Sequence, residues 1–200
     1  MRSSLIILGV FAFGILIGLL SIIPSSIDLG NLSMTVLYML MFLVGISLGL
    51  DKHIWEQIRQ MNIKLLLIPI TTLTGTAIGI VAYQLMFSYP KGADLYAIGA
   101  GFGYYSFSSI YINKVSGETM GIIALLANIS REVITLVFTP VIVKYFGKIA
   151  PIACGGATTS DTTLPVILKY TGKEYVLGSV LNGIILTILV PVIIAFIYSF

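Results

Sequence analysis

The chain has 200 residues, of which 58% are hydrophobic and only 10% are charged, and its mean hydropathy is +1.05. A soluble domain of this length would carry many more charged residues on its surface, so the composition excludes that class and predicts an integral membrane protein. The formal net charge of +3 is small, and most basic residues border apolar segments, which indicates membrane orientation rather than nucleic-acid binding.

Five uninterrupted apolar runs are long enough to cross the hydrocarbon core of a bilayer, which takes about 20 residues. They are residues 5–23, 32–50, 65–87, 119–145 and 175–198. The first run follows Arg2, and we expect it to be kept as a span, because Pro24 follows where a signal peptide would need a small-residue cleavage site.

Residues 51–64 form the one sizeable polar connector between these runs. Its apolar residues recur at helical spacing, which predicts a short helix on the membrane surface with Trp55 at the interface. His53 belongs to this connector, and we expect an ordinary interfacial residue there rather than a proton sensor.

Two further segments, 96–113 and 149–168, are hydrophobic but interrupted by glycines and hydroxyl residues, as in "GAGFGYYSFSS" and "CGGATTSDTTLP". Irregular backbone survives at membrane depth only where protein or water surrounds it. Cys154 is the only cysteine, so no intrachain disulfide is possible, and no second thiol or His stands near it. We therefore expect neither a metal site nor a cofactor.

The two interrupted segments resemble each other at a constant separation of 54 positions. The matching pairs are Gly101 and Gly155, Ser106 and Ser160, Ser108 and Thr162, Ser109 and Thr163, and Asn128 and Asn182. This pattern predicts a duplicated unit of one broken element and one full helix. We divide the single transmembrane domain, 1–200, into an N-terminal part (1–90), a first repeat unit (95–145) and a second (149–200).

The broken elements either cross the membrane or re-enter it as hairpins. Hairpins give the stronger Lys/Arg bias toward one face and place the two repeat units in opposite orientations. We therefore expect hairpins that enter from opposite faces, a cytoplasmic amino terminus, a cytoplasmic 51–64 connector and an external carboxyl terminus. The expected fold is all-α, with about five full transmembrane helices and two re-entrant hairpins in an inverted repeat.

Glu132 lies near the middle of the 119–145 run, where a charged side chain costs roughly 2.5–3.5 kcal/mol to insert. Its helical neighbours Asn128, Thr135 and Thr139 make one polar stripe. Two interpretations stand: a cation or proton site at Glu132, or a charge pair between Arg131 and Glu132 that holds helices together.

Asp161 is the second acid at membrane depth, in "TTSDTT". A break in a helix frees backbone amides and carbonyls, so this segment offers partners for both charges of an amino acid. The alternative is a hairpin tip where Asp161 only caps a helix. Asn128 and Asn182 fit substrate or interhelical hydrogen bonds, and we expect Tyr104 and Tyr105 to pack rather than line a pore.

Three motifs together, "GFGYYSFSS", "LLANISREVITL" and "GGATTSDTTLPVI", with "MFLVGISLG" upstream, resemble the LysO family of bacterial lysine exporters. The resemblance implies an inner-membrane transporter that expels lysine and its analogues in exchange for protons. It implies functional roles for Glu132 and Asp161, supported by hydroxyl and amide side chains. These supporting residues are Asn128 and the hydroxyls around Ser106 and Ser160, including Ser108 and Thr162. Asn182 is a further candidate because of its amide side chain.

Longer members of that family begin with a further hydrophobic region of about 100 residues. The resemblance therefore implies a small membrane partner subunit of about that size, or a homo-oligomer. We expect a secondary active exporter of L-lysine, not an enzyme, with protons and lipid as its other partners. The rival hypotheses are a membrane scaffold subunit that transports nothing and a passive channel for small cationic metabolites.

Overall fold

The computed structural model describes residues 67–199 continuously, together with isolated positions among residues 13–56. The chain forms two compact units, Met1–Val36 and Leu37–Phe200, and residues 67–199 all belong to the second. The runs predicted at 5–23 and 32–50 and the surface helix at 51–64 are described only at scattered positions.

Three long helices coincide with the runs predicted at 65–87, 119–145 and 175–198. They are α4 (Leu67–Met86), α7 (Glu118–Phe146) and α10 (Val176–Ile197). Each is long and apolar enough to cross a membrane, α10 together with the short 3₁₀ turn η3 (Lys173–Tyr175) that leads into it. Residues 67–199 contain helices and turns but no strand, which confirms the predicted all-α membrane fold for this part of the chain.

The first interrupted segment is a hairpin whose two ends meet. Helix α5 (Ala93–Gly99) leads into an irregular turn, and α6 (Tyr105–Ser116) returns from it. The Ser116 hydroxyl donates a hydrogen bond of 2.5 Å to Oδ1 of Asp94, so the end of α6 lies beside the start of α5. We call residues 93–116 hairpin 1, which is longer at both ends than the predicted 96–113.

The second interrupted segment is also a hairpin. Helix α8 (Ala150–Gly155) passes into a 3₁₀ turn, η2 (Gly156–Ser160), and then α9 (Leu164–Thr171) returns. The residues that flank it meet: Nζ of Lys148 lies 3.3 Å from Oε1 of Glu174 and over the ring of Tyr175. We call residues 150–171 hairpin 2.

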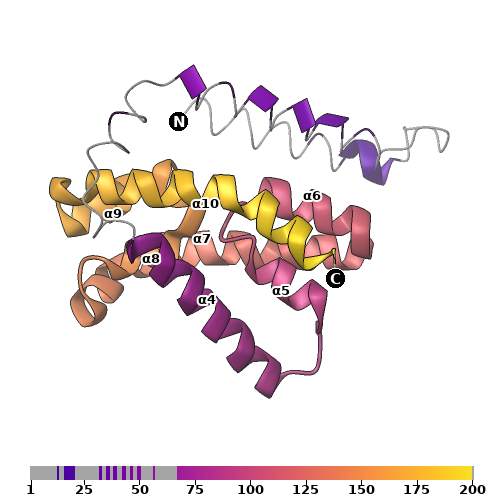
Figure 1. Ribbon diagram of the computed structural model, residues 1–200, viewed down its shortest axis with the longest axis horizontal. Helices are drawn as coiled ribbons and strands as arrows, with labels where there is room; N and C mark the ends of the chain where they lie inside the picture. The colour runs from indigo at the N-terminus through magenta and orange to yellow at the C-terminus, as the bar shows by residue number, and fades with distance from the viewer. Residues whose placement is uncertain are drawn as a thin grey trace. The chain divides into compact units, whose positions relative to one another are not determined.

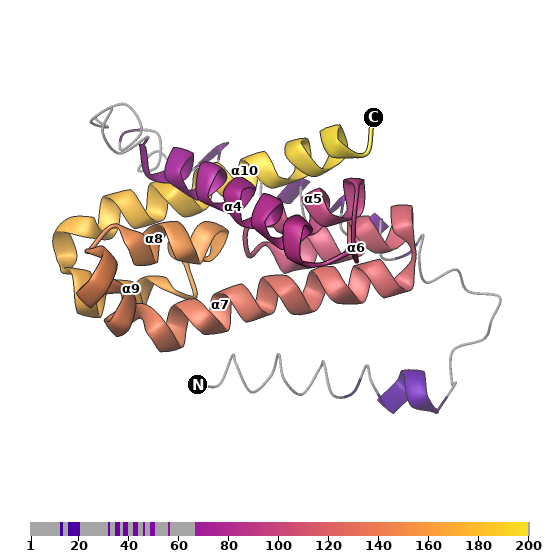
Figure 2. The same cartoon turned by 90° about the horizontal axis from the view of Figure 1, so that it is seen from below.

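The long helices α7 and α10 run antiparallel, and the hairpins lie between them (Figures 1 and 2). Hairpin 2 lies at one end of this pair and hairpin 1 at the other, as the turned view shows most clearly. The Tyr198 hydroxyl, just beyond α10, donates to Oδ1 of Asp94 at 2.8 Å, so α10 ends beside the outer end of hairpin 1. The two hairpins therefore point toward each other from opposite ends.

The backbone repeats itself at the separation of 54 positions found in the sequence. Phe102 and Gly156, one in each turn, both have positive φ, 45° and 63°. The side-chain amide of Asn128 donates to the carbonyl of Ile98 (3.1 Å), and that of Asn182 donates to the carbonyl of Ile152 (3.2 Å). The two hairpin-plus-helix units thus share local geometry, while the unit boundaries given above stay predictions.

Candidate functional site

The tips of the two hairpins touch. The backbone N–H of Ala157 donates a 2.8 Å hydrogen bond to the carbonyl oxygen of Phe102. A Cβ on Gly156 would overlap that same carbonyl oxygen, and the positive φ of Gly156 also favours glycine. The backbones of the two tips therefore approach closely, and Gly156 is the residue that permits it.

Hydroxyl side chains satisfy the carbonyls that the break in hairpin 2 frees. Thr158 donates to Gly155 (2.8 Å), Thr159 to Gly156 (2.7 Å), and Ser160 to Ala157 (3.2 Å). Unpaired peptide groups are costly at membrane depth, so this run of hydroxyls allows the helix to open there. A proline in the first turn of α9 then begins the returning helix.

Asn128 holds the tip of hairpin 1 from helix α7. Its Oδ1 accepts the backbone N–H of Gly103 at 2.8 Å, and its Nδ2 donates to Ile98 and, along its own helix, to Ala124. The side chain is 3% exposed, so these protein groups take up its hydrogen-bonding capacity.

Asn182 holds the tip of hairpin 2 from helix α10. Its Nδ2 donates to the carbonyl of Gly156 at 3.0 Å and to the hydroxyl of Thr159 at 3.1 Å. Its Oδ1 accepts the hydroxyl of Thr72 on α4 at 3.3 Å. The side chain is fully buried, so the two asparagines act as matched clamps on the two breaks.

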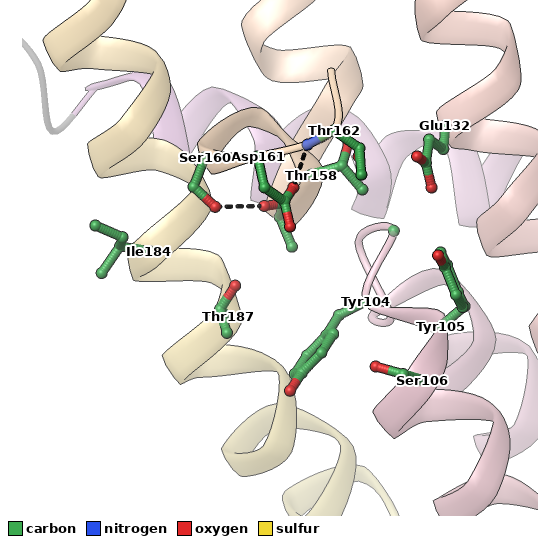
Figure 3. Close-up of a pocket in the computed structure, with 12 residues that line it drawn as sticks. Tyr104, Tyr105, Ser106, Glu132, Thr158, Ser160, Asp161, Thr162, Ile184 and Thr187 are labelled. Atoms are coloured by element: carbon green, nitrogen blue, oxygen red, sulfur yellow. Dashed lines mark hydrogen bonds between the residues drawn. The ribbon is translucent and has the colours of Figure 1, made fainter. Parts of the chain in front are cut away.

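A cavity of about 310 Å³ opens beside the touching tips (Figure 3). Its walls come from both hairpins and from helices α7 and α10. The lining residues are Gly103, Tyr104, Tyr105, Ser106, Glu132, Ala157, Thr158, Ser160, Asp161, Thr162, Ile184 and Thr187. The structure thus brings five predicted site residues together: Ser106, Glu132, Ser160, Asp161 and Thr162. Three others, Ser108, Asn128 and Asn182, are buried and do not line the cavity.

Two carboxylates share this cavity although they come from different elements. Glu132 reaches it from the middle of α7 and is half-buried, whereas Asp161 follows η2 and is exposed to the cavity. Asp161 accepts the backbone N–H of Thr162 at 2.6 Å through Oδ1. Within residues 67–199 neither acid forms an ion pair; the ion pair found there joins Lys148 and Glu174. Both acids are therefore available to a cation.

Arg131 does not pair with its neighbour Glu132. Its Nε donates to the carbonyl of Cys154 (2.8 Å), its Nη2 to that of Ala153 (3.1 Å), and its Nη1 to the hydroxyl of Thr76 (3.1 Å). These carbonyls end α8, where the helix dipole is negative, so the guanidinium neutralises that end. The charge-pair interpretation is wrong, and Arg131 faces a second cavity, between α4, α7 and α8.

The sequence did not point to the aromatic wall of the site. Tyr104 and Tyr105 were expected only to pack, yet both line the cavity, and Tyr104 also stacks on Phe107 with 6.2 Å between ring centroids. Their position directly after the glycines of the break is the feature of the sequence that could have indicated this role. The cavity positions of Ile184 and Thr187 on α10 could not be predicted from the sequence, because neither residue is unusual in an apolar helix.

Known proteins resemble this chain over nearly its whole length. The family model described as "Lysine exporter LysO" matches residues 8–198. The lysine exporter LysO of Escherichia coli K12 is 31% identical over 97% of this chain, and a putative lysine exporter of Haemophilus influenzae is 32% identical over 82% of it.

The match covers 64% of the Escherichia coli relative and 83% of the Haemophilus influenzae relative. No solved structure matches the chain. The residues matched by the family model, 8–198, span the hairpins, the clamps and the cavity described above. The chain belongs to the lysine exporter LysO family.

Proposed function

We propose that this chain is a secondary active exporter of L-lysine and lysine analogues in the bacterial inner membrane, driven by proton entry. The observation that carries the proposal is the pair of carboxylates, Glu132 and Asp161, in one cavity beside two opened helices. The names of the relatives support lysine as the substrate, and acids at membrane depth in transporters commonly mark ion or proton pathways.

The cavity suits a molecule with cationic and anionic groups. Asp161 offers a carboxylate to an ammonium group, and the rings of Tyr104 and Tyr105 add aromatic faces that attract cations. Hydroxyl groups of Ser106 and Thr187 line the same space and offer hydrogen bonds to an amino-acid carboxylate.

Lysine export needs a source of energy. Moving one positive charge out of a cell that is negative inside costs roughly 2.3 kcal/mol per 100 mV. A carboxylate that binds either a proton or the substrate ammonium couples the two movements, because one must leave before the other binds. We assign this exchange to Glu132, which is half-buried in α7 and free of an ion pair within the described residues.

Lysine binding tests the site. Asp161→Asn keeps the size of the side chain but removes its charge, so lysine affinity should fall about tenfold or more, as expected when a charged hydrogen bond is weakened. Glu174→Gln is the control, because this acid lies outside the cavity and is exposed. Calorimetry on the three purified proteins measures the affinities. Equal affinity in Asp161→Asn and the parent protein would place the substrate elsewhere.

Transport in proteoliposomes tests the coupling. The parent protein should move lysine in response to a pH gradient, and Glu132→Gln should fold normally yet lose that response. Lysine flux that ignores the proton gradient would identify a passive channel. Absence of flux in the correctly folded protein would favour a scaffold subunit.

The proposed orientation places the amino terminus and both flanks of hairpin 2 in the cytoplasm, and both ends of hairpin 1 outside. In intact cells, an impermeant thiol reagent should label a cysteine at Lys114 and not one at Lys148. Labelling of Lys148→Cys from outside would contradict the hairpin topology.

We also propose that the transporting unit holds more than this one chain, either a membrane subunit of about 100 residues or a second copy. Native mass spectrometry distinguishes the two. A second copy doubles the chain mass of 21.6 kDa, whereas the subunit adds about half of it. A complex with the mass of one chain would rule out both.

A further inference from the structure

We propose that this chain alternates between two states by exchanging hydrogen bonds between its hairpin tips, and that neutralising the charge of Asp161 favours the exchange. The proposal rests on the transport function proposed above. Its starting point is that equivalent groups of the two repeat units, 54 positions apart, have different partners in the structure.

The two peptide N–H groups at equivalent places in the tips show the difference. The N–H of Gly103 bonds to Oδ1 of Asn128, the clamp of its own repeat unit. The equivalent N–H, of Ala157, instead crosses to the other hairpin and bonds to the carbonyl of Phe102. The tip N–H of hairpin 1 thus bonds to its own clamp, while the equivalent N–H of hairpin 2 bonds to the other hairpin.

The equivalent carbonyls complete the pattern. The carbonyl of Phe102 is bound across the tips, whereas the carbonyl of Gly156 accepts Nδ2 of Asn182 within its own unit. In the exchanged state the N–H of Gly103 donates to Gly156, Phe102 accepts Nδ2 of Asn128, and the Ala157 N–H moves to Oδ1 of Asn182. Every tip group keeps a partner in both states, so the exchange leaves no peptide group unsatisfied.

Thr72 selects the state seen here. Its hydroxyl donates to Oδ1 of Asn182, the atom that the Ala157 N–H would need in the exchanged state. The same hydroxyl lies 3.1 Å from the carbonyl of Ile68 in its own helix, so it loses no essential bond by leaving Asn182. Removal of this hydroxyl should therefore favour the exchanged state.

The exposure of equivalent residues shows what the exchange would move. Thr162 lines the cavity and is exposed, whereas its equivalent, Ser108, is fully buried. Asp161 is also exposed, whereas its equivalent, Phe107, is 5% exposed. After exchange Ser108 would reach the cavity, and Asp161 would enter a buried place.

This movement gives Asp161 control over the exchange. Burial of an ionised carboxylate at membrane depth is costly unless a partner neutralises it. An empty, ionised transporter therefore favours its present state, while a bound ammonium or a proton shifts it toward the exchanged state. A substrate-free return with a net leak of charge is disfavoured for the same reason.

Two cysteine reporters test the exchange without lysine. In a Cys154→Ser background, the accessibility of Ser108→Cys and Thr162→Cys to a soluble maleimide is measured on the folded protein. Adding Thr72→Val should raise labelling at Ser108→Cys several-fold and lower it at Thr162→Cys. Thr74→Val is the matched control, because the Thr74 hydroxyl bonds only to carbonyls of its own helix. Equal labelling in both valine variants would overturn the role of Thr72.

The second variant tests the charge. Asp161→Asn should raise labelling at Ser108→Cys in the absence of lysine, because the neutral side chain enters the buried place more easily. Unchanged labelling in both Thr72→Val and Asp161→Asn overturns the exchange, even where lysine binds normally. If labelling changes as expected but the protein binds no lysine, the proposed substrate is wrong and the exchange stands. Failure of the exchange and failure of the proposed function are therefore distinguishable.

Discussion

Hairpin 1 and hairpin 2 share a backbone plan but carry different chemistry. Each opens beside a clamp asparagine and has a residue of positive φ at the matching position of its turn, Phe102 in hairpin 1 and Gly156 in hairpin 2. Hairpin 2 fills the positions after its break with hydroxyls and the acid Asp161, whereas hairpin 1 places Tyr104 and Tyr105 there. The difference teaches that a duplicated scaffold becomes a site for an asymmetric molecule when one half supplies polar partners and the other an aromatic wall.

The largest loss is expected where the hairpins touch. Gly156→Ala should prevent the tips from meeting, since its Cβ would overlap the Phe102 carbonyl in addition to the strain of positive φ. Gly92→Ala is the control: its φ of 66° is similar, but a Cβ there meets nothing within 4 Å, so it should cost only the backbone strain of about 1–3 kcal/mol. Thermal unfolding in detergent compares them, and equal losses would mean that the tips do not touch.

Arg131 should be the next most costly residue to remove, because two of its three hydrogen bonds satisfy carbonyls at the end of α8 in hairpin 2. Arg131→Met leaves the carbonyls of Ala153 and Cys154 without their charged donor, at about 1.5–3 kcal/mol for each bond lost. Glu132→Gln should leave the melting temperature unchanged, and the double variant should show additive effects. Non-additivity would reveal a pair between Arg131 and Glu132 that the structure does not show.

The two clamps should be equally important if the repeat units are equivalent. Asn128→Ala and Asn182→Ala each leave buried backbone groups without hydrogen-bond partners. The free energy of unfolding should fall by about 1–3 kcal/mol per group. Asn113→Ala, at an exposed position on α6, serves as the control and should change little. Melting temperatures provide the comparison; a loss confined to one clamp would show that only one hairpin depends on its asparagine.

The smallest effects are expected at the outer ends of the hairpins. Asp94→Ala removes the acceptor of two hydroxyl bonds, from Ser116 and Tyr198, and should cost about 1 kcal/mol. Glu174→Ala should not change the melting temperature measurably, because its partnership with Lys148 is exposed to solvent and weak. A larger loss of stability in Glu174→Ala than in Asp94→Ala would mean that the contact between the flanks of hairpin 2 contributes more than the contact at the ends of hairpin 1.

Much of this site could be predicted from the sequence because its signals are local. Hydrophobic length predicted α4, α7 and α10, and glycines among hydroxyl residues located both breaks. The acids Glu132 and Asp161 were predicted site residues because inserting a charged side chain at membrane depth costs free energy. The separation of 54 positions predicted the repeat, which now appears in the matched contacts of Asn128 and Asn182.

The partners of these residues depended on the tertiary structure. The sequence by itself determined that Arg131, Glu132 and the asparagines needed polar surroundings, because apolar helices tolerate such groups only when they are satisfied. Only the packed hairpins decided that Arg131 serves the end of α8, that the asparagines bind backbone, and that Glu132 and Asp161 share a cavity. The physical reason is that hydrogen bonds and cavities join residues far apart in the chain, and no periodicity records which tips will meet.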